Sequence, residues 1–113
     1  MSSAAPGPGE LIWVDFAPTS GTEQSGRRPA LVISDRGYNE ASGRALLMPV
    51  TSRVRGWPFE VELPAGSPVS GVVLADQVRC IDWRARSARP AGPAPPGVLE
   101  EARAKLSALA GLD

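Results

Sequence analysis

The chain contains no histidine and only one cysteine among its 113 residues. Without histidine, neither a Ser-His-Asp nor a Cys-His nucleophile system can be built. The single cysteine, Cys80, cannot form an internal disulfide, and its position in a strand-like run predicts an inert buried thiol. A lone cysteine is typical of a cytoplasmic protein, and this is the location that we expect.

Long apolar runs are also missing. The longest apolar segments are far too short to cross a bilayer, so we expect no membrane association. The first nine residues lack the basic start and apolar centre of a signal peptide. We predict a flexible tail over residues 1–8, followed by a single domain over residues 9–113.

The sequence shows no cluster of cysteine or histidine with metal-ligand spacing, and its carboxylates are scattered. We therefore expect no metal site and no other cofactor.

The charge of the chain is unevenly distributed. Net charge is zero, yet residues 27–89 hold ten arginines and no lysine against six acids. Arginine forks onto phosphate and stacks on bases, so this middle region indicates a phosphate-bearing partner. Solvated surface arginines are the alternative.

Short apolar segments separated by Gly and Pro predict a mainly β fold with a C-terminal helix, arranged as an SH3-like small antiparallel barrel. We expect a polar connection with at most one helical turn over residues 35–43 and a loop over residues 88–97. Glu60 and Glu62 alternate with apolar neighbours and are expected to point outward. The expected strands cover residues 10–16, 29–33, 44–51, 59–63, 72–75 and 77–81.

A closing helix is predicted over residues 97–110. It follows two prolines and ends at a glycine. Leu99, Ala102, Leu106 and Leu109 fall on one stripe, which we expect to pack on the barrel.

Two side chains at strand ends suggest a reaction. Arg28 lies at the exit of the polar loop 19–27, and Thr51 ends a later strand. If their strands pair antiparallel, both lie toward the same end of the sheet. A guanidinium beside a hydroxyl can hold and polarise a phosphodiester, and RNA carries its own nucleophile, the 2′-hydroxyl. A site that only positions and stabilises can therefore cleave RNA. Glu23, in the loop, supplies a carboxylate.

Other residues near these strand ends are candidates for RNA binding. Trp57 is suited to stack a base or to cover one end of the barrel. Trp13 is equally suited to the core, and Gln77 to a dimer interface. We interpret Trp83, Arg84 and Arg86 as structural residues or dimer contacts. The RNA-binding candidates are Trp13, Asp15, Phe16, Arg53, Arg55, Trp57 and Gln77.

Several segments, taken in order and with their spacing, resemble the MazF/PemK family of toxin endoribonucleases, or mRNA interferases, of type II toxin–antitoxin systems. The resemblance runs from Gly9 to the final helix. The segments that carry it are residues 9–16, 21–24, 28–30, 49–52, 56–61, 74–79 and 81–86.

The resemblance implies an SH3-like homodimer that cleaves single-stranded RNA at a short sequence without metal, leaving a 2′,3′-cyclic phosphate and a 5′-hydroxyl. It also implies a cognate antitoxin whose disordered, acidic C-terminal segment occupies the RNA groove. By position, Arg28 matches the catalytic arginine of the family, Thr51 its catalytic threonine and Glu23 a loop glutamate of the site. The general base stays open, because arginine is a poor proton acceptor and Glu23 can also be a solvated acid or a partner for Arg28.

Two other functions are compatible with a small β-barrel, because fold alone does not settle function. One is a non-catalytic SH3-like toxin or adaptor that binds a protein target such as gyrase. The other is a general RNA-binding module. The pairing of Arg28 with Thr51 favours the ribonuclease, since a protein-binding barrel has no need of that pair.

Overall fold

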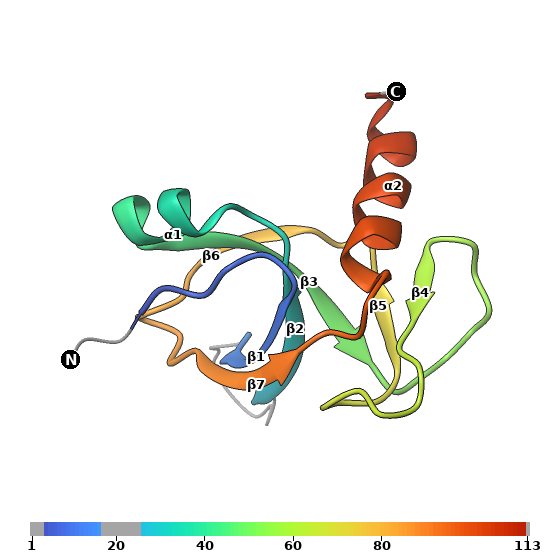
Figure 1. Cartoon of the computed structure of the whole chain (residues 1–113), viewed down its shortest axis with the longest axis horizontal. Coiled ribbons are helices and arrows are strands. Elements are labelled where there is room, and N and C mark those ends of the chain that lie inside the picture. The colour runs from blue at the N-terminus through green and yellow to red at the C-terminus, as the bar shows by residue number, and fades with distance from the viewer. Residues whose placement is uncertain (1–3, 17–25, 113) are drawn as a thin grey trace.

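The computed structural model describes residues 4–16 and 26–112, and Figure 1 shows their arrangement. These residues form an antiparallel sheet of seven strands and two helices. The elements are β1 (Glu10–Asp15), β2 (Arg27–Val32), α1 (Arg36–Ser42), β3 (Arg44–Thr51), β4 (Glu60–Glu62), β5 (Val72–Leu74), β6 (Arg79–Asp82), β7 (Arg89–Pro93) and α2 (Val98–Ala110).

The sheet branches at β3. The strand order is β4-β5-β3-β2-β1-β7, and β6 also pairs with β3. β6 accompanies the first half of β3, whereas β5 pairs with Val50 and Thr51 at its end. Pro49 lies between these two partners and pairs with neither β5 nor β6. The N–H that proline lacks is therefore not needed for a bond to either strand. The predicted mainly β, barrel-like fold with a C-terminal helix is confirmed, although the described strands do not close the barrel.

Strand alternation divides the core between the two faces of the sheet. In β2, for example, Leu31 belongs to one buried cluster, while Ala30 and Val32 belong to the other. α2 covers the first cluster through Val98 and Ala102. The second cluster includes Trp83 and, from the N-terminal segment, Ala5.

The predicted loop over residues 88–97 is wrong for its first half. Residues 89–93 form β7, which pairs antiparallel with β1 and has an irregular register between Leu11 and Ile12. β7 stands at the end of the strand order. An edge strand tolerates proline because one side of its backbone needs no partner, so Pro90 and Pro93 do not prevent pairing.

Residues 35–43 contain a seven-residue helix, α1, and so more than the single turn that we expected. The Asp35 carboxylate accepts from the backbone N–H groups of Gly37 and Tyr38, which caps the helix. Gly43, with φ of 75°, ends it. The prediction of a single turn overlooked these two signals, the aspartate cap and the terminal glycine.

Part of the expected N-terminal tail is packed against α1. The buried Asn39 side chain donates to Pro6 O at 2.7 Å, and Arg36 donates to Ala5 O at 2.5 Å. Residues 5–7 are buried. The described residues of this segment are therefore held by α1, whereas residues 1–3 lie outside the described part of the chain.

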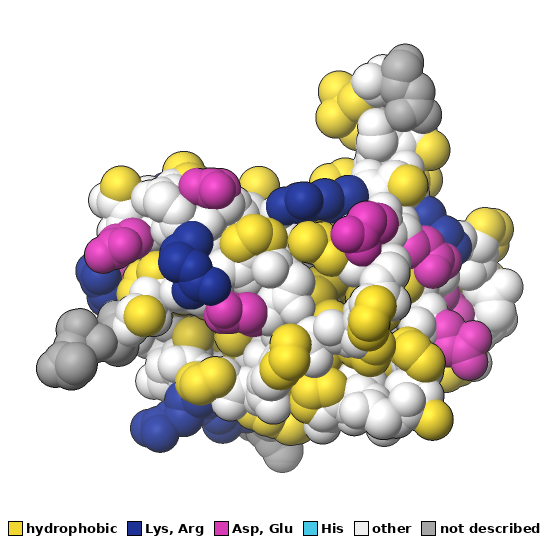
Figure 2. All heavy atoms as spheres, in the orientation of Figure 1, with side chains coloured by type: hydrophobic (Ala, Val, Ile, Leu, Met, Phe, Trp, Pro, Cys, Tyr) yellow, Lys and Arg dark blue, Asp and Glu magenta, His cyan; other side chains and the backbone are white. Residues whose placement is uncertain are grey.

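The closing helix α2 is confirmed, but its stripe is shorter than predicted. Ala102 is fully buried, and Leu99 and Leu106 pack against the first cluster. Leu109 is 55% exposed, because the last turns of α2 extend beyond the body of the protein (Figures 1 and 2). Neither described helix has the length and apolarity needed to span a membrane.

The expectation of a buried thiol is also wrong. Cys80 is exposed. It lies in β6, which has β3 as its only strand partner among the described residues, so one side of the strand remains open.

Candidate active site

Two adjoining cavities form a groove over the ends of β2 and β3. The larger has a volume of about 750 Å³ and the smaller about 400 Å³. Arg28, Thr51 and Gln77 line both cavities, so the two form one continuous surface. We call this surface the groove.

Strand register places Arg28 and Thr51 together. β2 and β3 pair with Ala30 opposite Pro49, and continuing this register by two residues sets Arg28 opposite Thr51. Residues opposite each other on antiparallel strands point to the same face. The structure therefore brings these two predicted residues to one rim, as the antiparallel pairing required.

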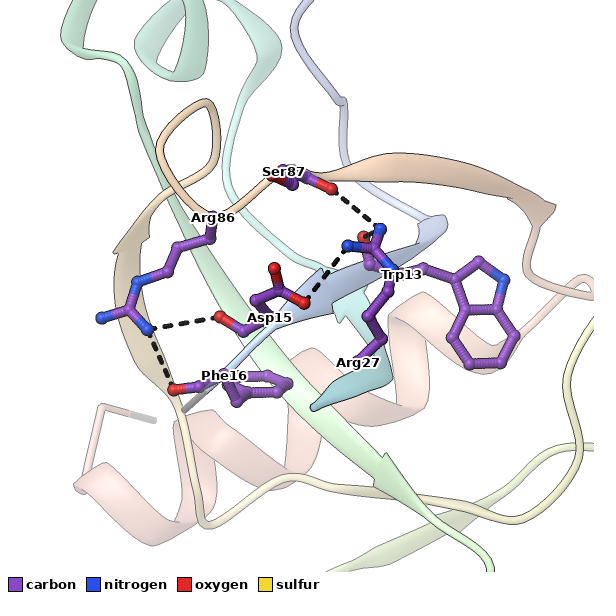
Figure 3. Close-up of polar contacts among 6 residues, drawn as sticks. All are labelled: Trp13, Asp15, Phe16, Arg27, Arg86 and Ser87. Carbon is purple, nitrogen blue, oxygen red and sulfur yellow. Dashed lines mark hydrogen bonds and ion pairs between the residues drawn. The ribbon is translucent and has the colours of Figure 1, made fainter. Parts of the chain in front are cut away.

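The two consecutive arginines at the start of β2 have different environments. Arg27 donates to Asp15 Oδ1 at 3.2 Å, to Trp13 O at 3.3 Å and to Ser87 O at 2.8 Å (Figure 3). Arg28, which points to the other face, makes no hydrogen bond or ion pair with any described residue. The guanidinium that lines the groove is thus available to an anion.

Arg86 fixes the end of β1 beside the groove. Its guanidinium donates to Asp15 O at 3.2 Å and to Phe16 O at 2.9 Å (Figure 3). The Phe16 ring lines the smaller cavity, and the Arg79 guanidinium lies 4.9 Å from its centroid. This stacking holds a flat apolar face and a cation next to each other in the groove.

The Thr51 hydroxyl is oriented by its own loop. Its oxygen accepts from the backbone N–H of Arg53 at 3.1 Å, which leaves the O–H free to donate. Behind Thr51 lies Gly71, with φ of 122°, where a Cβ would come 2.2 Å from Thr51 O. Only glycine fits there, so the backbone of residue 71 can lie directly against the backbone of Thr51.

Residues 53–58, which we call the groove wall, supply three lining residues of the larger cavity, Arg53, Arg55 and Trp57. The Arg55 guanidinium lies 5.2 Å from the Trp57 ring, and the Trp57 and Phe59 rings are 5.1 Å apart. Trp57 is 47% exposed and therefore presents a ring face that a base can reach.

The outward position predicted for Glu60 is wrong. Glu60 is 9% exposed, and its carboxylate accepts from the N–H groups of Arg55 at 3.2 Å and Gly56 at 2.9 Å. The turn at residues 57–60 brings these two donors over the start of β4, so the carboxylate turns toward them. Glu62 is exposed, as expected.

The groove is basic. Four arginines line it, and Glu60 is the only acid among its described lining residues. The carboxylate of Glu60 accepts two backbone hydrogen bonds, which partly neutralise its negative charge within the protein. The four arginines are Arg28, Arg53, Arg55 and Arg79.

Most predicted site residues line the groove. Phe16, Arg53, Arg55, Trp57 and Gln77 do so together with Arg28 and Thr51.

Trp13 and Asp15 do not line it, because Asp15 pairs with Arg27 and Trp13, 38% exposed, lies opposite Pro29. Glu23 lies outside the described residues. Sequence reasoning missed Glu60 and Arg79; the arginine excess of residues 27–89 included Arg79 without singling it out.

The segment between β6 and β7 contains three residues that we expected to be structural or to make dimer contacts, Trp83, Arg84 and Arg86. Trp83 is buried and donates from Nε1 to Asn39 O at 2.9 Å, and Arg84 stacks on its ring. Arg86 holds the end of β1. Within the described part of the chain, no three His, Cys, Asp or Glu side chains group in a way that would hold a metal ion.

Residues 7–110 match the family of PemK-like, MazF-like toxins of type II toxin–antitoxin systems. The chain belongs to this family. The match spans every lining residue of the groove and all nine described elements.

Known members of the family are similar along nearly their whole length. The endoribonuclease toxin MazF of Escherichia coli K12 is 48% identical, with 98% of this chain and 99% of that protein covered. The E. coli endoribonuclease toxin ChpB is 40% identical, with 89% and 90% covered. A MazE–MazF crystal structure from Deinococcus radiodurans is 51% identical, covers 98% of this chain and 100% of the solved chain, and superposes with a TM-score of 0.93. These relatives identify the protein as an endoribonuclease toxin of the MazF type.

Proposed function

We propose that the protein cuts single-stranded RNA at a short sequence by attack of a 2′-hydroxyl on its neighbouring phosphate, without a metal ion. The products are a 2′,3′-cyclic phosphate and a 5′-hydroxyl. The observation that carries this proposal is the Arg28 guanidinium, which no described residue binds, opposite Thr51 at the rim of a basic groove.

In the proposed reaction the 2′-oxygen forms a bond to phosphorus while the bond to the 5′-oxygen breaks. Arg28 neutralises the charge that develops on the phosphorane and donates a hydrogen bond to the leaving 5′-oxygen, which takes a proton from solvent water to become the 5′-hydroxyl. The Thr51 hydroxyl donates to a non-bridging oxygen; the Arg53 N–H bond to its oxygen orients the hydroxyl and leaves the O–H for this role. Glu23 is the candidate that accepts the proton of the 2′-hydroxyl, since arginine stays protonated.

The remaining groove residues bind the RNA on either side of the scissile phosphate. Trp57 and Phe16 offer ring faces for stacking, Arg53 and Arg55 contact phosphates, and Gln77 contacts a base edge. Trp13 and Asp15, at the end of β1, stay proposed contacts for nucleotides that extend past the groove.

We also propose two protein partners. One is a second copy of this chain. The other is a cognate antitoxin with a disordered, acidic C-terminal segment, which the basic groove suits by charge. Solved relatives include MazE–MazF complexes from D. radiodurans.

The test is an incubation of wild-type protein with mixed-sequence single-stranded RNA in the presence of a chelator. We expect discrete cuts whose upstream fragments end in a cyclic phosphate, and no cuts with Arg28→Ala. Intact RNA after incubation with the wild type, together with loss of a protein partner in the variant, would instead favour the adaptor function. Antitoxin peptide should block cutting, and added salt should weaken the block.

A further inference from the structure

The groove wall, residues 53–58, has almost no backbone support of its own. Residues 53–56 make no backbone–backbone hydrogen bond with the described residues. Their backbone N–H bonds instead go to two side chains: Arg53 to the Thr51 hydroxyl, and Arg55 and Gly56 to the Glu60 carboxylate. The arrangement of the wall therefore depends on a few side-chain acceptors.

Helix α2 holds the other end of the same wall. The Lys105 ammonium donates to Pro58 O at 2.5 Å and to Glu60 O at 3.0 Å, and it pairs with Glu101 at 3.4 Å. α2 stands beside β4 in Figure 1, and the two bonds of Lys105 join the helix to the turn that ends the wall. Glu60 thus receives support at its backbone while its carboxylate supports Arg55 and Gly56.

We propose that Glu60 is a positioning residue for RNA binding, with Lys105 in support: it holds the groove wall so that Arg53, Arg55 and Trp57 face the substrate. This inference rests on the proposed function, because it assigns the wall to RNA. Glu60 itself has both carboxylate oxygens directed at the protein backbone, so it acts through the wall rather than on the phosphate.

A purely electrostatic role of Glu60 makes the opposite prediction. Glu60 is the only acid among the described lining residues of the groove, so neutralising it would make the groove more positive and bind RNA more tightly. Loss of positioning weakens binding, because an amide N–H₂ in place of one oxygen would face a backbone donor. The sign of the change in KM therefore separates the two roles.

The experiment compares Glu60→Gln with Glu62→Gln, using a short single-stranded RNA that the wild type cuts. Glu62 lies in the same strand and is exposed, so both variants lose one negative charge. For Glu60→Gln we expect KM to rise roughly tenfold and kcat to stay within about twofold, since the wall binds RNA away from the bond that breaks. For Glu62→Gln we expect an unchanged or slightly lower KM.

Lys105→Met with Glu101→Gln as its control tests the support from α2. Met keeps the apolar stem of Lys105 but cannot donate to Pro58 O and Glu60 O, whereas Glu101→Gln removes only the ion pair. We expect a higher KM in the first variant and an unchanged KM in the second. A KM that stays at the wild-type value in both Glu60→Gln and Lys105→Met would overturn the inference, as would a lower KM in Glu60→Gln.

Amide hydrogen exchange gives a reading that needs no RNA. Exchange at Arg55 and Gly56 should become at least about tenfold faster in Glu60→Gln and stay unchanged in Glu62→Gln. Unchanged exchange in Glu60→Gln would refute the role of this carboxylate even if RNA is cut as proposed. A wild-type protein that cuts no RNA would refute the proposed function, while exchange would still report whether Glu60 holds the wall.

Discussion

Arg27 and Arg28 are separated by one peptide bond, yet their surroundings differ completely. Arg27 lies opposite Asp15 of β1, and its guanidinium is bound to three oxygens of the protein, from Asp15, Trp13 and Ser87. Arg28 lies on the opposite face, at the groove, and no described residue binds it. Strand alternation alone therefore binds one arginine within the protein and leaves the other facing the groove.

The largest effect is expected when Arg28 is removed. Arg28→Ala should lower kcat at least about a thousandfold, because it deletes the cation that faces the developing phosphorane charge. Its thermal unfolding midpoint should stay at the wild-type value, because Arg28 makes no bond to a described residue. Quantitative cleavage assays and thermal denaturation check the two halves. A variant that cuts RNA at the wild-type rate would show that Arg28 is no more than a surface cation.

Thr51→Val removes the hydroxyl while keeping the shape of the side chain. We expect kcat to fall by roughly a hundredfold, since one donor to the transition state is lost. Because the Arg53 N–H also loses its acceptor, KM should rise as well. Thr51→Ser keeps both functions and serves as the control. Equal activity of the Val and Ser variants would contradict a role for the hydroxyl.

Gly71→Ala tests whether the backbone behind Thr51 sets its position. The added Cβ would come 2.2 Å from Thr51 O, and the φ of 122° disfavours any residue with a side chain. We expect kcat to fall by roughly tenfold and the free energy of unfolding to fall by about 1–3 kcal/mol. Gly66→Ala is a matched control, because Gly66 also has a positive φ, of 95°, but has open space around it. Similar activity in the two variants would show that strain alone explains the effect.

The smallest effect on activity is expected for the bound arginine. Arg27→Ala should lower the free energy of unfolding by about 1 kcal/mol, since its bonds to Asp15, Trp13 and Ser87 are partly exposed. The kcat of the folded protein should change less than about threefold. Denaturant unfolding and cleavage assays on the same preparation measure both quantities. If Arg27→Ala lost as much activity as Arg28→Ala, the division of labour between the two residues would be wrong.

Much of the fold could be predicted from local patterns. The strand at residues 44–51 was predicted with its observed bounds, and the closing helix within one residue. The errors arose where a tertiary partner decides the outcome. β7 forms because β1 offers a free edge, and Leu109 is exposed because α2 runs past the sheet. Neither the formation of β7 nor the exposure of Leu109 can be predicted from the local sequence alone.

The site shows the same division. Arg28 and Thr51 were predicted from strand ends and from the family resemblance, and the register places them together. Glu60 was missed because strict alternation places its side chain outward, whereas the turn before β4 brings two N–H donors to it. Alternation predicts only which face of a sheet a side chain points to. It cannot predict that the backbone N–H groups of Arg55 and Gly56 lie close enough to bind the carboxylate.

In the proposed reaction the RNA supplies the nucleophile, its own 2′-hydroxyl, while Arg28 and Thr51 stabilise the transition state. The most direct measurement uses an RNA oligonucleotide with a single 2′-deoxy sugar on the 5′ side of the cut phosphate. We predict that this oligonucleotide binds as the all-ribose form does and is not cut at that position. Cleavage there at a rate similar to that of the all-ribose form would contradict attack by the 2′-hydroxyl.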